Sequence, residues 1–179
     1  MTTPEPLPRR KPGLTFIFLG VIAAGLAIAW FVRGLGDTEG VATPGADAPR
    51  FRVELIDGGF FDLEEHLDRE TPRAVVVNLW ASWCLPCRTE IPEISAFADA
   101  HPDVTVIGVA VQDSESASRA FAAEIGASYP LALGDTAFAD AYIAPGLPAT
   151  FVVDAAGKVR VVHHGIVDRA DLEEMIEGV

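Results

Sequence analysis

Hydrophobic residues form one long uncharged run near the N-terminus, and after residue 50 they form shorter segments with strand-like or helix-like periodicity. The long run covers residues 14–32 and, as a helix, would span about 28 Å, close to the hydrocarbon thickness of a bilayer. Beyond residue 50, short continuous or alternating apolar segments predict strands, and apolar residues three and four apart predict helices. The expected strands are 51–55, 60–61, 73–80, 104–111, 150–153 and 158–163, and residues 129–133 are expected to be a short strand or an extended segment. The expected helices are 62–67, 86–100, 114–125, 135–142 and 168–176.

The order of these elements predicts an α/β fold, with a central mixed sheet flanked by helices. Segments 73–80 and 104–111 are near-continuous apolar runs, which are typical of strands covered on both faces. A turn signal at residues 57–59 predicts a β-hairpin at the start of the domain, and residues 154–157 predict a second hairpin near its end. We therefore expect one folded domain over residues 51–179.

The N-terminal part of the chain is predicted to place this domain at a membrane. Residues 1–13 are rich in proline and basic side chains, and we expect them to form a disordered cytoplasmic tail. The basic residues of this tail lie just before the run 14–32, so the positive-inside bias places everything after the run outside the cytoplasm. Residues 33–50 are rich in Gly, Ala and Pro and are expected to form a flexible linker.

The run 14–32 has two interpretations. Trp30 and Phe31 lie at its far end, where an aromatic belt would be, and this favours a retained transmembrane signal-anchor. Residues 27–29 have the small-x-small form of a cleavage site, which is typical of a secretory signal peptide that is removed. Both interpretations place the domain on the periplasmic or cell-surface side, and the first makes the protein a single-pass protein held by membrane lipid.

The charge of the chain excludes one class of partner. The formal net charge is −13, and four of the 13 basic residues but only one of the 26 acidic residues lie within positions 1–36. The body of the protein is therefore strongly acidic and repels nucleic acid, so we expect no nucleic-acid partner.

The chain contains two cysteines, Cys84 and Cys87, and both lie where the expected strand 73–80 leads into the expected helix 86–100. At the first turn of a helix, unpaired N–H groups and the helix dipole favour negative charge, which lowers the pKa of a thiol and supplies thiolate. Cys84 is expected to face outward and attack a disulfide, and Cys87 can then resolve the mixed disulfide. Pro86 suits this first turn, where its missing N–H costs nothing.

Other roles for the cysteine pair have weaker support. A zinc site needs about four ligands, and the sequence has neither a second C-x-x-C motif nor a clustered pair of histidines. His163 and His164 are adjacent on an expected strand, so they point to opposite faces and would chelate poorly. A purely structural disulfide is the remaining alternative, but the strand-to-helix setting is typical of a redox motif. We expect no metal and no cofactor.

Several motifs together carry a family resemblance. They are NLWASWCLPCRTEIP, then GLPATFVVD, then a Gly-Lys hairpin and Gly165. With these motifs the chain resembles the thioredoxin-like family, and within it the membrane-anchored TlpA/ResA/CcmG (DsbE)-type thiol:disulfide oxidoreductases. The resemblance covers residues 51–179 and implies a thioredoxin-like fold with an N-terminal β-hairpin extension. That group includes reductases of cytochrome c maturation.

The resemblance also implies roles for individual residues. Cys84 matches the nucleophile and Cys87 the resolving thiol, which together form a redox-active disulfide. Trp83 matches an active-site tryptophan beside the pair, although it could instead be a core aromatic residue. Pro148 is similar to a cis-proline that packs against the cysteines, and Leu147 would present its backbone to the substrate.

Two polar positions near the pair distinguish this sequence from many cytoplasmic thioredoxins. Those proteins carry a buried Asp six residues before the first cysteine, where this chain has Asn78, which cannot titrate. The cytochrome c maturation reductases carry a Glu where this chain has Glu90, three residues after Cys87. Glu90 is therefore a candidate for tuning the thiols, and the alternative is a solvated Glu that is favourable in an early helical turn.

The sequence therefore predicts an extracytoplasmic thiol-disulfide oxidoreductase, acting as a protein-disulfide reductase in cytochrome c maturation. The expected partners are a disulfide-bearing protein substrate, with apocytochrome c as one candidate, and a membrane protein that donates thiol reductant. One alternative is a peroxiredoxin-like thiol peroxidase, although the usual signature of such an enzyme does not precede Cys84. Another is a non-enzymatic metallochaperone or binding module on the same fold, which would keep its activity without Cys84.

Overall fold

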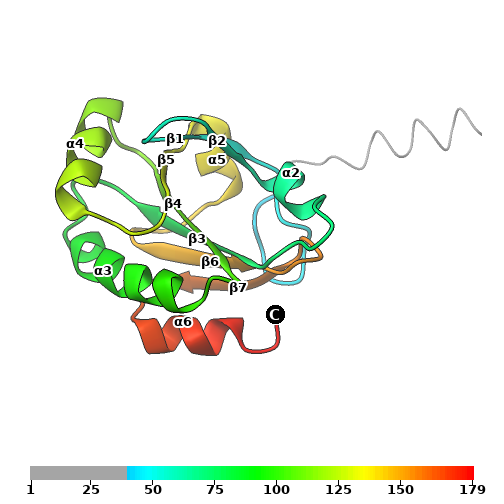
Figure 1. Cartoon of the computed structure of the whole chain (residues 1–179). Helices are drawn as coiled ribbons and strands as arrows, with labels where there is room; N and C mark the ends of the chain where they lie inside the picture. The colour runs from blue at the N-terminus through cyan, green and yellow to red at the C-terminus, as the bar shows by residue number, and fades with distance from the viewer. Residues whose placement is uncertain (1–39) are drawn as a thin grey trace, which may run out of the picture. The chain divides into compact units, whose positions relative to one another are not determined.

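The computed structural model describes residues 40–179 (Figure 1). The tail 1–13, the run 14–32 and the first part of the linker lie outside the described residues. Among the helices of residues 40–179, none has the length and apolar character that crossing a bilayer requires.

The described residues form seven strands and five helices. The strands are β1 (Arg52–Leu55), β2 (Phe60–Asp62), β3 (Val75–Trp80), β4 (Thr105–Ala110), β5 (Leu131–Leu133), β6 (Ala149–Val153) and β7 (Val159–His164). The helices are α2 (Leu63–Leu67), α3 (Leu85–Ala100), α4 (Glu115–Ile125), α5 (Thr136–Ala141) and α6 (Arg169–Ile176). Each expected element is present.

The strands form one mixed sheet in the order β2-β1-β5-β4-β3-β6-β7. Strand β3 lies inside the sheet between β4 and β6, parallel to β4 and antiparallel to β6, and all six of its residues are buried. In this register Asn78 of β3 lies beside Gly108 of β4 and Thr150 of β6. The predicted α/β fold with a central mixed sheet is confirmed, as is the N-terminal hairpin, in which β1 and β2 are antiparallel.

Helices cover both faces of the sheet (Figure 1). Leu63 of α2 and Phe138 of α5 pack with the side chains of one face. Ile91 of α3, Phe121 of α4 and Leu172 of α6 pack with the side chains of the other face. Each face therefore has its own hydrophobic core, and the second core includes both cysteines.

Gly108 allows two aromatic rings to pack closely over β4. A Cβ atom at this position would lie 2.7 Å from Cδ2 of Leu131, 3.1 Å from Cε2 of Tyr129 and 3.2 Å from Cδ1 of Trp80. Interiors are packed at crystal-like density, so one added methyl group would force these side chains apart.

Residues 129–133, expected to be a short strand or an extended segment, contain the short strand β5, which begins at Leu131. The reason is Pro130, which has no N–H to donate to a ladder. Its carbonyl still accepts a hydrogen bond from the amide of Gly108 at 3.0 Å, so the chain at Pro130 lies against β4 without being a regular strand.

Residues 40–50, which the sequence places in the flexible linker, are packed against the domain. The amide of Ala42 donates to the carbonyl of Ala141 at 2.8 Å, and the hydroxyl of Tyr142 donates to the carbonyl of Pro49 at 2.8 Å. Ala42 and Ala48 are buried in the first core. The packed part of the chain therefore begins before Phe51, because small apolar residues of this Gly- and Ala-rich segment fit into the core.

Candidate active site

Cys84 and Cys87 are joined in a disulfide at the N-terminus of α3. Strand β3 ends at Trp80, a short turn follows, and Cys84 occupies the N-cap position with extended backbone angles. The amide of Cys87 donates a hydrogen bond to Sγ of Cys84 at 3.2 Å. Pro86 lies in the first turn, where a proline leaves no helical hydrogen bond unmade.

This arrangement suits Cys84 to be the attacking thiol. The first amides of a helix lack intrahelical partners, and together with the helix dipole they stabilise a negative charge at the N-cap. In the reduced protein, the amide of Cys87 would donate to a thiolate at Cys84, and such a bond favours the charged form. The geometry therefore supports thiolate formation at Cys84.

The sulfur atoms themselves are not open to solvent in the disulfide form. Cys84 is only 3% exposed and Cys87 is fully buried, so the expectation that Cys84 faces outward is wrong for this form. The residues on either side of Cys84 are instead exposed, Trp83 at 60% and Leu85 at 75%. A substrate that approaches the disulfide therefore meets apolar surface first.

Trp83 is an exposed side chain with a fixed hydrogen bond, so the alternative of a core aromatic residue is wrong. Its indole Nε1 donates to the carbonyl of Gln112 at 3.1 Å. Trp83 also lines a groove of about 120 Å³, and the other lining residues include Ile143, Pro145 and Leu147. The groove joins the cysteine loop to the segment before β6.

Pro148 is a cis-proline, as the resemblance implies, and its packing against the cysteines stays a prediction. The cis peptide bond joins Leu147 to Pro148, and Pro148 is buried just before β6. Leu147 is half-buried and packs against both hydrophobic cores, one of which contains Cys84 and Cys87. The carbonyl of Pro148 accepts a hydrogen bond from the amide of Gly165 at 3.0 Å.

Glu90 is fully buried, so the alternative of a solvated glutamate is wrong. Its Oε1 accepts a hydrogen bond from Nδ2 of Asn78 at 2.7 Å, and its Oε2 accepts one from the amide of Val167 at 3.2 Å. Burial raises the pKa of Glu90 to about 7, against the lowering effect of these two hydrogen bonds. Glu90 can therefore take up or release a proton near neutral pH.

Asn78 connects this carboxyl to the centre of the sheet. Its side chain lies on the face of β3 that α3 covers, and Nδ2 also lies 3.4 Å from Oγ1 of Thr150 on β6. An amide at this position can donate to an ionised Glu90 without adding a second negative charge. Asn78 therefore favours the ionised form of Glu90, whereas an aspartate here would oppose it.

The sequence contains a signal for the burial of Glu90. The buried positions of α3 are Cys87, Glu90, Ile91, Ile94 and Phe97. They are spaced three and four apart, which is the pattern of one buried helical stripe. Glu90 falls on that stripe, so its inward orientation follows from the periodicity of the helix.

Other residues at the site have no such signal in the sequence. Val167 precedes α6 and lies far along the chain from Glu90, yet its amide binds the carboxyl. Gln112 and Asp113 follow β4, and they contact Trp83 and Ser82 in the loop before Cys84. These contacts depend on tertiary structure, because each joins segments separated by about thirty residues or more. Within residues 40–179, no group of three or more His, Cys, Asp or Glu side chains is placed to hold a metal ion.

Comparison with known proteins identifies related sequences along most of the chain. The model of the AhpC/TSA family matches residues 44–162. The chain is 32% identical over 156 residues to the thiol:disulfide interchange protein HelX of Rhodobacter capsulatus, covering 83% of this chain and 84% of that protein. It is 31% identical over 166 residues to the thiol:disulfide interchange protein DsbE of Escherichia coli, covering 90% of this chain and 88% of that protein.

A solved structure has the same fold. The crystal structure of a thiol:disulfide interchange protein of the thioredoxin family from Chlorobium tepidum matches with a TM-score of 0.65 and 29% sequence identity. The match covers 75% of this chain and 96% of that one. The similarity includes the expected thioredoxin-like fold, which is therefore confirmed.

Replacing Glu90 with glutamine is expected to flatten the pH dependence of stability between pH 4.5 and about pH 7. Burial raises the pKa of Glu90 from 4.5 to about 7, so in this window the folded state binds more protons than the unfolded state. The contribution of the neutral carboxyl is fully present below pH 4.5 and is lost as the pH rises through about 7, by up to about 3 kcal/mol.

Urea unfolding of the wild type and Glu90→Gln across this window measures the effect. The matched control is Glu93→Gln, which alters an exposed glutamate of the same helix and should retain the wild-type slope. Equal slopes in the wild type and Glu90→Gln would contradict the assignment of the raised pKa to Glu90.

Proposed function

Because this chain belongs to the AhpC/TSA family and is a thiol-disulfide oxidoreductase, we propose that it reduces disulfides of protein substrates outside the cytoplasm. The observation that carries the proposal is the Cys84–Cys87 disulfide at the N-terminus of α3, with the amide of Cys87 directed at Sγ of Cys84. The apolar surface around Cys84 supports a protein rather than a small polar molecule as substrate.

The proposed cycle begins with the reduced cysteine pair. The Cys84 thiolate attacks one sulfur of the substrate disulfide, a bond forms between them, and the other substrate sulfur leaves as a thiolate that takes up a proton. Cys87 then loses its proton and attacks Sγ of Cys84, which releases the second substrate thiol. Two electrons pass to the substrate, and the Cys84–Cys87 disulfide that remains is reduced again by a dithiol donor.

Glu90 is proposed to accept the proton of Cys87 during resolution. Both residues are buried on the same stripe of α3, and solvent has no direct access to Cys87. A carboxyl with a pKa of about 7 is well matched to proton transfer at neutral pH. Asn78 would hold Glu90 in position throughout the cycle.

In more detail, we propose that the protein is a membrane-anchored reductase of cytochrome c maturation. The similarity to HelX and DsbE, which are thiol:disulfide interchange proteins, supports thiol-disulfide interchange, and the uncharged run 14–32 supports a membrane anchor. Apocytochrome c is the proposed substrate, and a membrane thiol protein is the proposed donor. The reductive direction follows from the resemblance of the site to the reductases of that process.

Replacing Cys87 with serine is expected to trap the substrate. Without the resolving thiol, the mixed disulfide with Cys84 should accumulate in the native membrane, and its mass would identify the substrate. Cys84→Ser is the matched control, because it keeps one thiol but removes the attacking one, and it should form little adduct. The adduct from Cys87→Ser should disappear on treatment with a reductant.

The same two variants also distinguish the proposed reductase from the other functions that the sequence allows. A binding module or metallochaperone would keep its activity in Cys84→Ser, and a peroxidase would consume peroxide with a thiol donor while forming no protein adduct. Either result would contradict the proposed reductase.

The reduction potential of the cysteine pair is expected to lie toward the reducing end of the range of related proteins, which is about −270 mV. The Leu-Pro dipeptide between the cysteines leaves the potential open, so a direct measurement in glutathione buffers is needed. A value near about −120 mV would instead make the protein an oxidant.

Glu90→Gln is expected to slow resolution above pH 7. In the wild type the rate of attack by Cys87 on a mixed disulfide should rise as Glu90 ionises, with an inflection near pH 7. The glutamine variant should lack this inflection and be slower by up to about 10²-fold, the lower end of general base catalysis. Single-turnover release of substrate thiol measures the rate, with Glu93→Gln as control, and an unchanged profile would remove Glu90 from the mechanism.

A further inference from the structure

Three consecutive residues after β4 contact the loop that leads from β3 to Cys84. The amide of Val111 donates to the carbonyl of Trp80 at 3.0 Å. Oδ2 of Asp113 accepts a hydrogen bond from the amide of Ser82 at 2.6 Å. Between them, the carbonyl of Gln112 accepts from the indole of Trp83 at 3.1 Å. We call residues 111–113 the clasp, because they bind the end of β3 and the cysteine loop at three points.

Asp113 is the residue on which the clasp depends. Its Oδ2 binds the hydroxyl of Ser118 at 3.1 Å in addition to Ser82, and its Oδ1 binds the amide of Ser114 at 2.8 Å. Partial burial alone would raise the pKa of Asp113, but the hydrogen bonds from these three serines lower it. The carboxylate is therefore ionised at neutral pH and connects the cysteine loop to the start of α4.

Gln112 has a backbone conformation that the clasp requires. Its φ is 54°, the only positive value among the non-glycine residues of the described chain. A side chain in this region costs on the order of 1 kcal/mol or more, and such residues persist only where their surroundings hold them. In this conformation its carbonyl accepts the hydrogen bond from Trp83.

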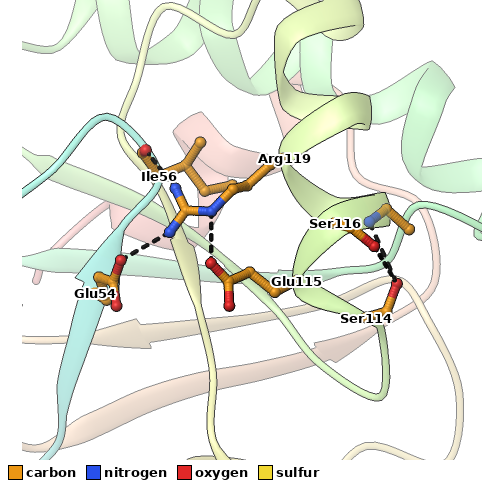
Figure 2. A network of polar contacts seen from close by, with 7 residues as sticks. Glu54, Ile56, Ser114, Glu115, Ser116 and Arg119 are labelled. Atoms are coloured by element: carbon orange, nitrogen blue, oxygen red, sulfur yellow. Dashed lines mark hydrogen bonds and ion pairs between the residues drawn. The ribbon is translucent and has the colours of Figure 1, made fainter.

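The base of the clasp is anchored to the rest of the domain through α4. Figure 2 shows Arg119 of α4 binding three acceptors at once, two carboxylates and a carbonyl. Its Nε lies 2.8 Å from Glu115 and its two terminal nitrogens lie 2.7 Å from Glu54 and 2.8 Å from the carbonyl of Ile56. Ser114 caps the helix beside Asp113 by accepting from the amide of Ala117. These bonds connect the first turn of α4 to β1 and to the residue just after β1. The segment that follows the clasp is therefore fixed to the sheet.

We propose that the clasp is a positioning device for thiol-disulfide exchange, in which Asp113 holds the loop before Cys84 so that Trp83 keeps one orientation beside the disulfide. Trp83 lines the groove together with Ile143 and Leu147, so a change in its orientation would change the shape of that groove. The clasp would therefore act mainly on how a protein substrate binds. This inference rests on the proposed exchange at Cys84 with protein disulfides.

The test compares steady-state reduction of a protein disulfide, insulin, by the full chain and by Asp113→Asn. Losing a hydrogen bond to a charged group should raise KM by about tenfold, with a smaller effect on kcat. Ser118→Ala is the matched control, because it removes the other hydrogen bond to Oδ2 and leaves the contact to Ser82. Asp99→Asn controls for the loss of one negative charge, because Asp99 is exposed on α3. Both controls should keep KM near the wild-type value.

Hydrogen exchange of the indole N–H of Trp83 gives a second measurement that does not depend on activity. The NMR signal of this indole N–H is assigned by its absence in Trp83→Phe. The exchange of this proton with solvent should be faster in Asp113→Asn than in the wild type and both controls. Exchange and KM that remain at wild-type values in Asp113→Asn would overturn the proposal.

A double-mutant cycle keeps the proposal testable if Asp113→Asn loses stability. If Asp113 acts through Trp83, combining Asp113→Asn with Trp83→Phe should raise KM no further than Trp83→Phe alone, and additive effects would contradict this. A wild-type chain that fails to reduce insulin, together with a Cys87→Ser variant that traps no protein adduct, would refute the proposed function, and the indole exchange would still decide whether the clasp holds Trp83.

Discussion

The carboxyl of Glu90 lies inside the protein, and a buried carboxyl must find hydrogen-bond donors or remain protonated. Asn78 on the central strand and the amide of Val167 before α6 supply them. The two bonds join the helix that carries the cysteines to the middle of the sheet and to the C-terminal part of the chain. The position of α3, and with it the position of the disulfide, therefore depends on satisfying one ionisable group.

The loop before Cys84 is held from the opposite direction. Residues 111–113 follow β4, which lies next to β3, and they bind the cysteine loop just where β3 ends. The helix side of the site thus contains a group that can titrate near pH 7, while the loop side contains a carboxylate that stays ionised. A site built in this way can change its protonation on one side without loosening the other.

Much of this arrangement follows from local patterns in the sequence. The buried runs 73–80 and 104–111 are local features, and the structure has the corresponding strands β3 and β4. The cysteine pair is equally local, because its members are three positions apart on one helical turn. The packed part of the chain begins before residue 51, where the sequence predicts the start of the domain. The segment before residue 51 has small residues without periodicity, and only the shape of the core shows that Ala42 and Ala48 fit there.

The partners of the site residues could not be predicted in the same way. Glu90 lies on the apolar stripe of α3, which indicates burial, but the stripe does not show which donors will meet the carboxyl. That pairing depends on the register of β3 against β4 and β6, which places Asn78 beneath the helix. The residue type at position 78 then determines how Glu90 titrates. An aspartate at 78 would place two carboxyls within hydrogen-bond distance in the core, where like charges cannot both ionise and one proton would be shared. With asparagine at position 78, Glu90 titrates without a second carboxyl beside it. The proposed proton acceptor Glu90 and the thiol of Cys87 then lie on the same helix, α3.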